Sequence, residues 1–282
     1  MDTRIFKRKI KNSLIYMYKI KKKELKKIIT EIKKNGYVCL PKVYKKSFCK
    51  KIIKKLEIIL KKIKSKNKYY GSNKNQVIYN YFYYDLNLIK LAHNSIIDKI
   101  MKELIDDDYV LISPSARNPR IINKNEDHKK TTGFGWHVDS RVIGQKSNSL
   151  IKPSISYFAI IALEDFTKFN ASTKYVERSH KLYKKPKNRE IKIKSKNMIA
   201  KAGSIIFFDT ALWHRVGEPT KISRWSIFNM YGPWYMKPYF RFTDGLSQKK
   251  IKKLSRHQKK ILHFNSIPPV NSDNGIRTLK KI

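Results

Sequence analysis

The sequence predicts a mainly β domain, an antiparallel barrel or sandwich, with helices packed on the outside. In the first part of the chain, apolar residues recur at the three- and four-residue spacing of buried helix faces. After Ser113 the pattern changes to short apolar runs that turn residues separate at short intervals, which is typical of strands. Helices followed by such a dense series of strands favour a β core with a helical cover. With 282 residues, the chain is long enough to bury a substantial core.

The first part of the chain predicts alternating helices and short strands. The first 34 residues are basic with interspersed Ile, Leu and Tyr, a pattern compatible with an amphipathic helix that Asn35-Gly36 ends. We therefore divide the chain into a basic N-terminal helical segment, residues 1–34, and a single domain, residues 35–282. Within the domain we expect helices at 45–63 and 86–104 and strands at 37–40 and 109–112.

Strands dominate after Ser113. We expect them at residues 118–123, 154–163, 204–208, 212–216 and 224–231. A basic helix at residues 247–261 is the last element that the pattern predicts.

The charge of the chain is strongly positive, with 64 Lys and Arg against 21 Asp and Glu, a formal net charge of +43. Such a charge can attract nucleic acid, anionic membranes or acidic small molecules. It can also follow from a gene composition that favours lysine codons, which we prefer because lysine dominates and is spread over the whole chain. A nucleic-acid site would instead group arginines and aromatic residues on one element, so we expect no nucleic-acid partner. Residues 1–34 keep two alternatives open, peripheral contact with an anionic membrane or a helix packed on the domain.

Cysteine usage predicts a reducing, cytoplasmic location. The only two cysteines, Cys39 and Cys49, are too few for a disulfide framework and belong to no zinc-binding pattern. The first twelve residues contain no uninterrupted apolar core, so we expect no signal peptide. Peripheral attachment to a membrane remains the alternative.

The strongest candidate for chemistry is the tripeptide His137-Val138-Asp139. In an extended segment, residues two apart point to the same side, so the imidazole and the carboxylate converge. A third candidate ligand, His214, lies far downstream in a strand-like run, where a folded sheet could bring it close. Arg224 begins the next expected strand, with Ser226 on the same face.

These residue types suit one kind of metal chemistry. Two histidines and one carboxylate form the facial triad of non-haem Fe(II) oxygenases, which leaves coordination positions open. A 2-oxo acid can occupy two of those positions. The far carboxylate of 2-oxoglutarate then needs a planar cation, and the guanidinium of Arg224 offers a bidentate, always-charged fork.

At these motifs the chain resembles the phytanoyl-CoA dioxygenase family, over most of its length from Asn35 to about Pro269. The resemblance rests on the segments 136–139, 162–165, 177–181 and, most specifically, 203–225. It implies a double-stranded β-helix, or jelly-roll, core with the N-terminal helices packed outside. It also implies Fe(II) as cofactor, with 2-oxoglutarate and O2 as co-substrates.

The resemblance assigns roles residue by residue. His137, Asp139 and His214 take the iron-ligand positions, and Arg224 takes that of the 2-oxoglutarate anchor. Less specifically, it implies that the amide of Asn118 contacts 2-oxoglutarate and that Ser226 lies beside the anchor. The retained Asp139 argues against the related halogenases, which lack this carboxylate. No catalytic residue beyond the metal ligands is implied.

The substrate is the least defined part of the prediction. Phe134, Trp136 and Arg141 flank the ligand motif and are candidates for the substrate pocket. The expected reaction is hydroxylation of an aliphatic C–H bond in a small organic molecule, and the positive charge favours an anionic one. Two alternatives stay open. One is a basic nucleic-acid- or membrane-binding protein on the same barrel with a vestigial iron site, and the other is a hydroxylase of a lipid or glycan at a membrane surface.

Overall fold

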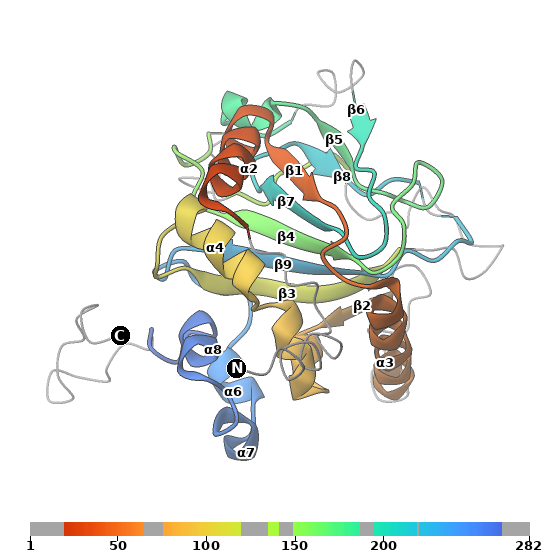
Figure 1. Cartoon of the computed structure of the whole chain (residues 1–282), viewed down its shortest axis with the longest axis vertical. Helices are drawn as coiled ribbons and strands as arrows, with labels where there is room; N and C mark the ends of the chain where they lie inside the picture. Colours follow the sequence, from red (N-terminus) through yellow and green to blue (C-terminus); the bar gives the residue numbers. More distant parts are fainter. Residues whose placement is uncertain are drawn as a thin grey trace, which may run out of the picture.

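The centre of the protein is a six-stranded antiparallel sheet with the strand order β1-β7-β4-β9-β3-β2, accompanied by a three-stranded sheet with the order β6-β5-β8 (Figure 1). The computed structural model describes residues 20–64, 76–119, 135–140, 149–186, 195–218 and 220–266. The strands of the large sheet are β1 (Tyr37–Leu40), β2 (Gln76–Tyr79), β3 (Val110–Asn118), β4 (Tyr157–Ala162), β7 (Ile205–Asp209) and β9 (Ser226–Gly232). Those of the small sheet are β5 (Lys174–Val176), β6 (Ser195–Asn197) and β8 (His214–Arg215).

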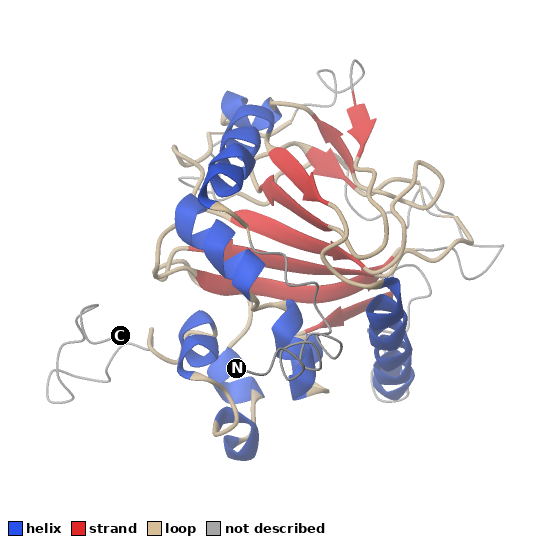
Figure 2. Cartoon of the chain, viewed as in Figure 1, coloured by secondary structure: helices blue, strands red, loops and turns tan. Residues whose placement is uncertain are grey.

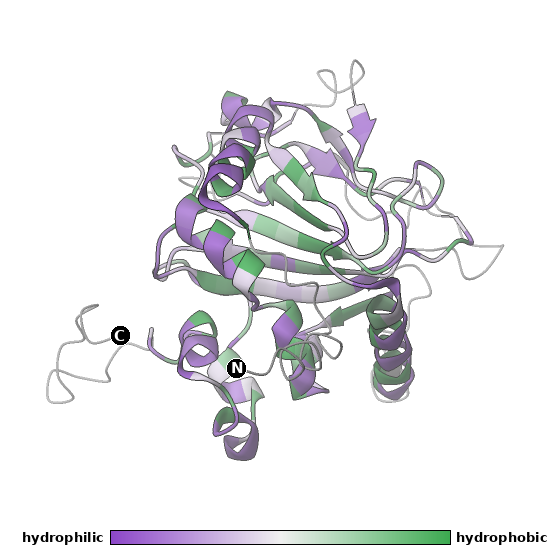
Figure 3. Cartoon of the chain, viewed as in Figure 1, coloured by the Kyte–Doolittle hydropathy of each residue, from purple (hydrophilic) through white to green (hydrophobic). Residues whose placement is uncertain are grey.

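Successive residues of the large sheet enter two different hydrophobic cores. On β4, Phe158 and Ile160 pack into the core shared with the small sheet, while Ala159 and Ile161 pack into the core under the helices. This alternation follows from the two-residue period of a strand, and it places one face of every strand towards the space between the two sheets. Figure 3 shows the resulting concentration of hydrophobic residues on the central strands. The prediction of a mainly β core with outer helices is therefore confirmed.

Helices cover the other face of the large sheet (Figure 2). The cover consists of α2 (Lys22–Asn35), α3 (Lys46–Lys64), α4 (Ser95–Leu104) and the short α6 (Phe242–Gly245), α7 (Gln248–Ile251) and α8 (Arg256–Ile261), with 3-10 turns η2 (Tyr81–Tyr83) and η3 (Leu86–Leu91) between them. A further 3-10 turn, η4 (Ser179–Leu182), follows β5. The predicted helix at 45–63 and the predicted strand at 37–40 are both confirmed.

Helix α2 packs into the domain that follows it. Ile28 and Ile32 are buried in the core under the helices, and the helix ends at Gly36, whose amide donates to the carbonyl of Ile32. Gly36 has φ of 88°, a left-handed conformation that glycine adopts without strain. Within the part of the chain that the structure describes, no helix is long and apolar enough to cross a membrane. Residues 1–19 lie outside that part.

In the region from Tyr109 to Asn123, the strand expected at 109–112 is longer than predicted, and the strand expected at 118–123 falls largely outside the described residues. β3 continues through Pro114, and residues 120–134 lie outside the described residues. The nitrogen of Pro114 points to the β2 side, as its carbonyl does in accepting from Asn80, and the pairing with β2 begins only at Ser115. The missing amide therefore costs no ladder hydrogen bond, which explains why proline does not end this strand.

Two predicted helices are each divided in the structure. The segment from Leu86 to Leu104 breaks before Asn94, whose side-chain oxygen accepts from the amides of Ile96 and Ile97 and thereby starts α4. The segment from Ser247 to Ile261 breaks at Ser255, which forms a capping box with Gln258. In both cases a strong N-cap starts a new helix inside an otherwise continuous apolar period.

Candidate metal centre

His137 and His214, which are 77 positions apart in sequence, are brought together by a short antiparallel bridge. The amide of each residue donates to the carbonyl of the other, and both N···O distances are 3.0 Å. His214 belongs to β8, so residue 137 extends the edge of the small sheet. The bridge places the two imidazole rings 4.4 Å apart between centroids.

Asp139 is held by the turn that follows β7. The carbonyl of Thr210 accepts from the amides of Asp139 at 2.9 Å and Ser140 at 3.1 Å. Thr210 is fixed in turn by Ser156, because its hydroxyl donates to the Ser156 carbonyl at 3.0 Å. Ser156, the residue before β4, thus helps to position Asp139 through Thr210.

The three side chains converge as the sequence predicts. Nε2 of His214 lies 3.1 Å and Nε2 of His137 4.0 Å from Oδ2 of Asp139, and the three potential ligand atoms lie within 4.8 Å of one another. Neighbouring donors around an ion bound at about 2.1 Å are about 3 Å apart, so only a small closure is needed to bind one. The donor set and its geometry fit Fe(II).

Backbone carbonyls fix the tautomer of both histidines. Nδ1 of His137 lies 2.8 Å from the carbonyl of Gly135, and Nδ1 of His214 lies 2.7 Å from that of Leu212. A carbonyl can only accept, so each Nδ1 must be the donor. In the neutral rings the Nε2 lone pairs are then left for a metal ion, as in most metal-bound histidines.

The ionisation states also suit a metal centre. Burial, and then the proximity of His214, lower the pKa of His137, which favours the neutral ring that metal binding requires. Burial alone would raise the pKa of Asp139, but the hydrogen bond and charge of His214, together with the charges of His137 and Arg117, bring it down to about 2. The carboxylate is therefore ionised at neutral pH.

Arg224 is buried in the core between the two sheets. Its side chain is 2% exposed, and its guanidinium carbon lies 4.2 Å from the centroid of the Phe166 ring. Its Nε and Nη1 have no hydrogen-bond partner among the described residues. Burial, and then the charge of Arg117, lower the pKa of Arg224 to about 9, while Glu164 acts in the opposite direction. A buried cation with unused N–H donors fits an anionic ligand, because a bound carboxylate would satisfy both its charge and its hydrogen bonds.

The main chain at Arg224 is fixed by side chains of neighbouring strands. Oδ1 of Asn118 accepts from the amide of Arg224 at 2.8 Å and from the hydroxyl of Ser223 at 3.2 Å. The amide nitrogen of Asn118 donates to the side chain of Gln76 at 2.8 Å. Both ends of the Asn118 amide are thus engaged in positioning Arg224, and its direct contact with 2-oxoglutarate stays a prediction.

Ser226 lies near the anchor, two residues further along. Arg224 precedes β9 rather than opening it, and Ser226 is its first residue. The hydroxyl of Ser226 donates to the carbonyl of Arg117 at 3.2 Å, which links β9 to β3. Because Phe228, on the same face of β9, packs in the core between the sheets, this face leads towards the metal centre.

Arg117 is a residue of this region that the sequence did not indicate. Its guanidinium carbon lies 4.9 Å from the centroid of Phe228, and its Nε donates to the hydroxyl of Ser115 at 2.9 Å. Its positive charge contributes to the pKa values of Asp139, His137 and Arg224, so it lies within electrostatic reach of all three. Simple alternation over residues 110–118 would not have identified it, because a bulge between Leu111 and Ser113 shifts which face the later residues occupy.

Of the three residues expected to line the substrate pocket, only Trp136 lies among the described residues. Phe134 and Arg141 lie outside the described residues. Trp136 is half-buried, and the guanidinium carbon of Arg215 lies 5.8 Å from its ring centroid. The contact with Arg215 gives Trp136 a fixed neighbour on β8, and its place in a substrate pocket stays a prediction.

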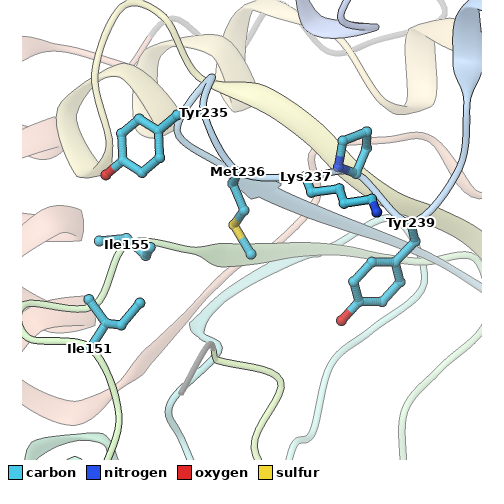
Figure 4. A pocket seen from close by; sticks show the side chains of 7 residues that line it. Ile151, Ile155, Tyr235, Met236, Lys237 and Tyr239 are labelled. Carbon is cyan, nitrogen blue, oxygen red and sulfur yellow. The ribbon is translucent and has the colours of Figure 1, made fainter. Parts of the chain in front are cut away.

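A cavity of about 620 Å³ opens between two loops of the domain, as Figure 4 shows. One loop precedes β4 and ends at Ile155, next to Ser156, the residue that fixes Thr210. The other loop follows β9 and includes Met236, which also packs in the core between the sheets. The wall is apolar and aromatic with one ammonium group, and it consists of Ile151, Ile155, Tyr235, Met236, Lys237, Pro238 and Tyr239.

Two antiparallel sheets with a His-x-Asp motif, a distant histidine and a buried arginine define the class of non-haem iron oxygenases that use a 2-oxo acid. The family model of phytanoyl-CoA dioxygenase (PhyH) matches residues 32–224. The chain belongs to the phytanoyl-CoA dioxygenase family. It is thus a 2-oxoglutarate-dependent dioxygenase with a jelly-roll core, and His137, Asp139 and His214 are the residues that could hold the iron of this class.

Solved structures show the same fold at low sequence identity. HygX from Streptomyces hygroscopicus, in the structure with nickel and 2-oxoglutarate bound, has a TM-score of 0.57 and 12% identity over 76% of this chain and 89% of that chain. SnoN, the non-haem alpha-ketoglutarate-dependent epimerase from nogalamycin biosynthesis, has a TM-score of 0.55 and 15% identity over 77% and 87%. A search of curated proteins finds no match to the chain.

Proposed function

We propose that the protein hydroxylates an aliphatic C–H bond of a small organic substrate. In this reaction one oxygen atom of O2 enters the substrate as a hydroxyl group, and the other enters succinate as 2-oxoglutarate loses CO2. The observation that supports the proposal most directly is the convergence of His137, Asp139 and His214, whose potential ligand atoms lie within 4.8 Å of one another.

Each residue of the site has a distinct task in this proposal. His137, Asp139 and His214 would hold Fe(II) through two imidazole nitrogens and one carboxylate oxygen. The bound ion would supply the activation of O2 that the protein side chains cannot provide. Arg224 would bind the far carboxylate of 2-oxoglutarate, with its main chain fixed by Asn118. Since Asp139 keeps the carboxylate ligand, we expect hydroxylation rather than halogenation.

The cavity between the two loops supports a choice of substrate class. Tyr235, Met236 and Tyr239 offer contacts to an apolar body, and Lys237 offers a cation to an anionic group. A cavity of this size accommodates one small molecule. We therefore propose that this cavity receives the substrate, and that the substrate has an apolar portion and a carboxylate or phosphate group.

Succinate release from candidate metabolites tests the proposal, because it reports activity and substrate together. Active substrates should yield succinate and a product that has gained one oxygen atom, as mass spectrometry would show. His214→Ala, which removes a ligand on the buried side of the centre, should abolish both signals. Succinate release with a product of unchanged mass would contradict hydroxylation while leaving the oxygenase class intact. A His214→Ala variant with full activity would contradict the proposed centre itself.

A further inference from the structure

A second group of metal-binding side chains lies on the helical side of the large sheet, away from the small sheet. His93 follows η3, Asp98 lies in the first turn of α4, and His257 lies in α8. The potential ligand atoms of the three lie within 4.8 Å of one another, as they do in the His137 centre. The rings of His93 and His257 also have the same centroid separation as those of His137 and His214, 4.4 Å.

Nε2 of His257 and Oδ1 of Asp98 lie close together without a hydrogen bond between them. Nε2 of His257 is shielded from solvent and lies 3.0 Å from Oδ1 of Asp98. It nevertheless has no hydrogen bond of adequate geometry in the part of the chain that the structure describes. A ring nitrogen so close to a carboxylate oxygen is unfavourable unless a proton or a cation lies between them.

The environment of the two histidines disfavours the proton. Burial, and then the charge of the neighbouring His257, lower the pKa of His93 to about 4. Burial also lowers the pKa of His257, while the charge of Asp98 acts in the opposite direction. Imidazole binds metal ions in its neutral form.

A hydrogen bond from Tyr109 orients the carboxylate of Asp98. The hydroxyl of Tyr109 donates to Oδ1 of Asp98 at 3.1 Å, and Tyr109 is itself fully buried. Such a hydrogen bond fixes the carboxylate and leaves its remaining lone pairs for another contact. The cluster thus has two imidazoles and one oriented carboxylate.

We propose that His93, Asp98 and His257 form a second metal site, which binds a divalent ion of the zinc type and ties α8 to α4. Two imidazoles and one carboxylate are a ligand set that Zn²⁺ accepts, with water as the fourth ligand. The site is separate from the His137 centre and plays no part in the proposed hydroxylation. Because the ion would join elements that are 159 positions apart in sequence, its effect would be structural.

Lys102 opposes this site and offers a way to test it. Its ammonium lies 3.5 Å from Oδ2 of Asp98, one helical turn away, so it competes with a cation for the carboxylate. Lys102 is partly exposed and also lies 3.5 Å from Asp107, towards which it can turn when the ion binds. Removal of its charge should therefore strengthen metal binding.

The test uses the full-length His137→Ala/His214→Ala variant, in which the first centre is disabled. Titration with Zn²⁺ in a calorimeter should show one ion bound per chain, and the midpoint of thermal unfolding should rise when Zn²⁺ is added. Replacement with Co²⁺ should give the visible absorption of a four-coordinate ion with nitrogen and oxygen ligands. Adding His257→Gln or Asp98→Asn should weaken binding at least tenfold and abolish the rise in the unfolding midpoint.

Lys102→Gln in the same background should tighten Zn²⁺ binding several-fold, a result that does not require any ligand variant to fold. Circular dichroism would check that each variant is folded. Stoichiometric binding that survives both ligand substitutions, an affinity that Lys102→Gln leaves unchanged or lowers, or the absence of a bound ion in the parent variant would overturn the proposal.

Discussion

Arg224 is the residue whose surroundings most clearly indicate a bound ligand. It is buried, its Nε and Nη1 lack partners among the described residues, and its main chain is fixed by the oxygen of Asn118. A fixed guanidinium fork is matched to a carboxylate, whereas an ammonium provides only a point charge. Replacing Arg224 with lysine therefore tests whether the fork, and not only the charge, binds the carboxylate.

Arg224→Gln should raise the KM for 2-oxoglutarate by about 10- to 100-fold, the loss of one charge-assisted hydrogen bond or more. Arg224→Lys, which keeps the charge but not the fork, should give a smaller increase. Initial rates of succinate release over a range of 2-oxoglutarate concentrations measure both. Equal KM values for the wild type and Arg224→Gln would exclude Arg224 as the anchor.

Arg117 should contribute to the same ligand through its charge. Since it lies over Phe228 and influences the pKa values of both Asp139 and Arg224, Arg117→Gln should raise the KM for 2-oxoglutarate, though less than Arg224→Gln does. Arg256→Gln, which removes an equal charge from an exposed position, is the matched control. The same steady-state measurement applies, and an identical KM in both variants would contradict the interior role of Arg117.

The sequence predicted some of these residues and not others for a physical reason. His137 and Asp139 are recognisable because their spacing is local, and His214 and Arg224 because they stand close together in a specific run of residues. Arg117 was missed because it lies between the strands expected at 109–112 and 118–123, and because the bulge between Leu111 and Ser113 shifts the alternation of β3. The cluster around His257 could not be predicted, since its members meet only through the packing of separate helices.

At the scale of elements, the start of α4 depends on Asn94. Its oxygen accepts from two backbone amides of the first turn, and its amide nitrogen donates to the hydroxyl of Tyr44 at 3.0 Å. This cap explains why the apolar period from Leu86 to Leu104 forms two elements rather than one helix. Local capping chemistry overrides hydrophobic period where the two conflict.

Asn94→Ala should lower the free energy of unfolding by about 1–2 kcal/mol, as the loss of an N-cap typically does. Asn94→Asp keeps the capping oxygen and should cost less, although it loses the donor to Tyr44. Chemical denaturation followed by circular dichroism would measure the difference. If the alanine variant were no less stable than the aspartate variant, the N-cap at Asn94 would not contribute to the free energy of unfolding.

The long central strands β4, β7 and β9 were predicted well, whereas the short strands β2, β5 and β6 were not predicted. Successive residues of β4 and β9 pack into opposite cores. Because both faces of these strands are buried, their sequences are continuous apolar runs that are easy to recognise as strands. The basic segment from Ser247 to Ile261 has a weaker signal. Its two short helices depend on the capping box at Ser255.

At the scale of the whole molecule, the charge of +43 does not identify a partner. Helix α2 belongs to the core through Ile28 and Ile32, so its apolar face is already occupied. Membrane attachment would therefore have to use residues 1–19 or another surface. Deleting residues 1–34 would remove part of the core, and residues 1–19 are the appropriate deletion.

We expect the full chain and the chain without residues 1–19 to bind anionic vesicles equally, and both to be released at about 0.5 M salt, because a diffuse surface charge is screened. Sedimentation with vesicles that contain phosphatidylserine would measure this, with neutral vesicles as the control. Binding that resists salt and disappears with the deletion would instead indicate a dedicated membrane segment.

The central claim is that His137, Asp139 and His214 form a working Fe(II) and 2-oxoglutarate site. Under anaerobic conditions, adding Fe(II) and 2-oxoglutarate to the folded protein should give a weak visible charge-transfer band, which neither compound gives alone with the protein. The band should be absent from His214→Ala and should require a higher 2-oxoglutarate concentration in Arg224→Gln. A folded, iron-loaded wild-type protein that shows no band at saturating 2-oxoglutarate would contradict the account.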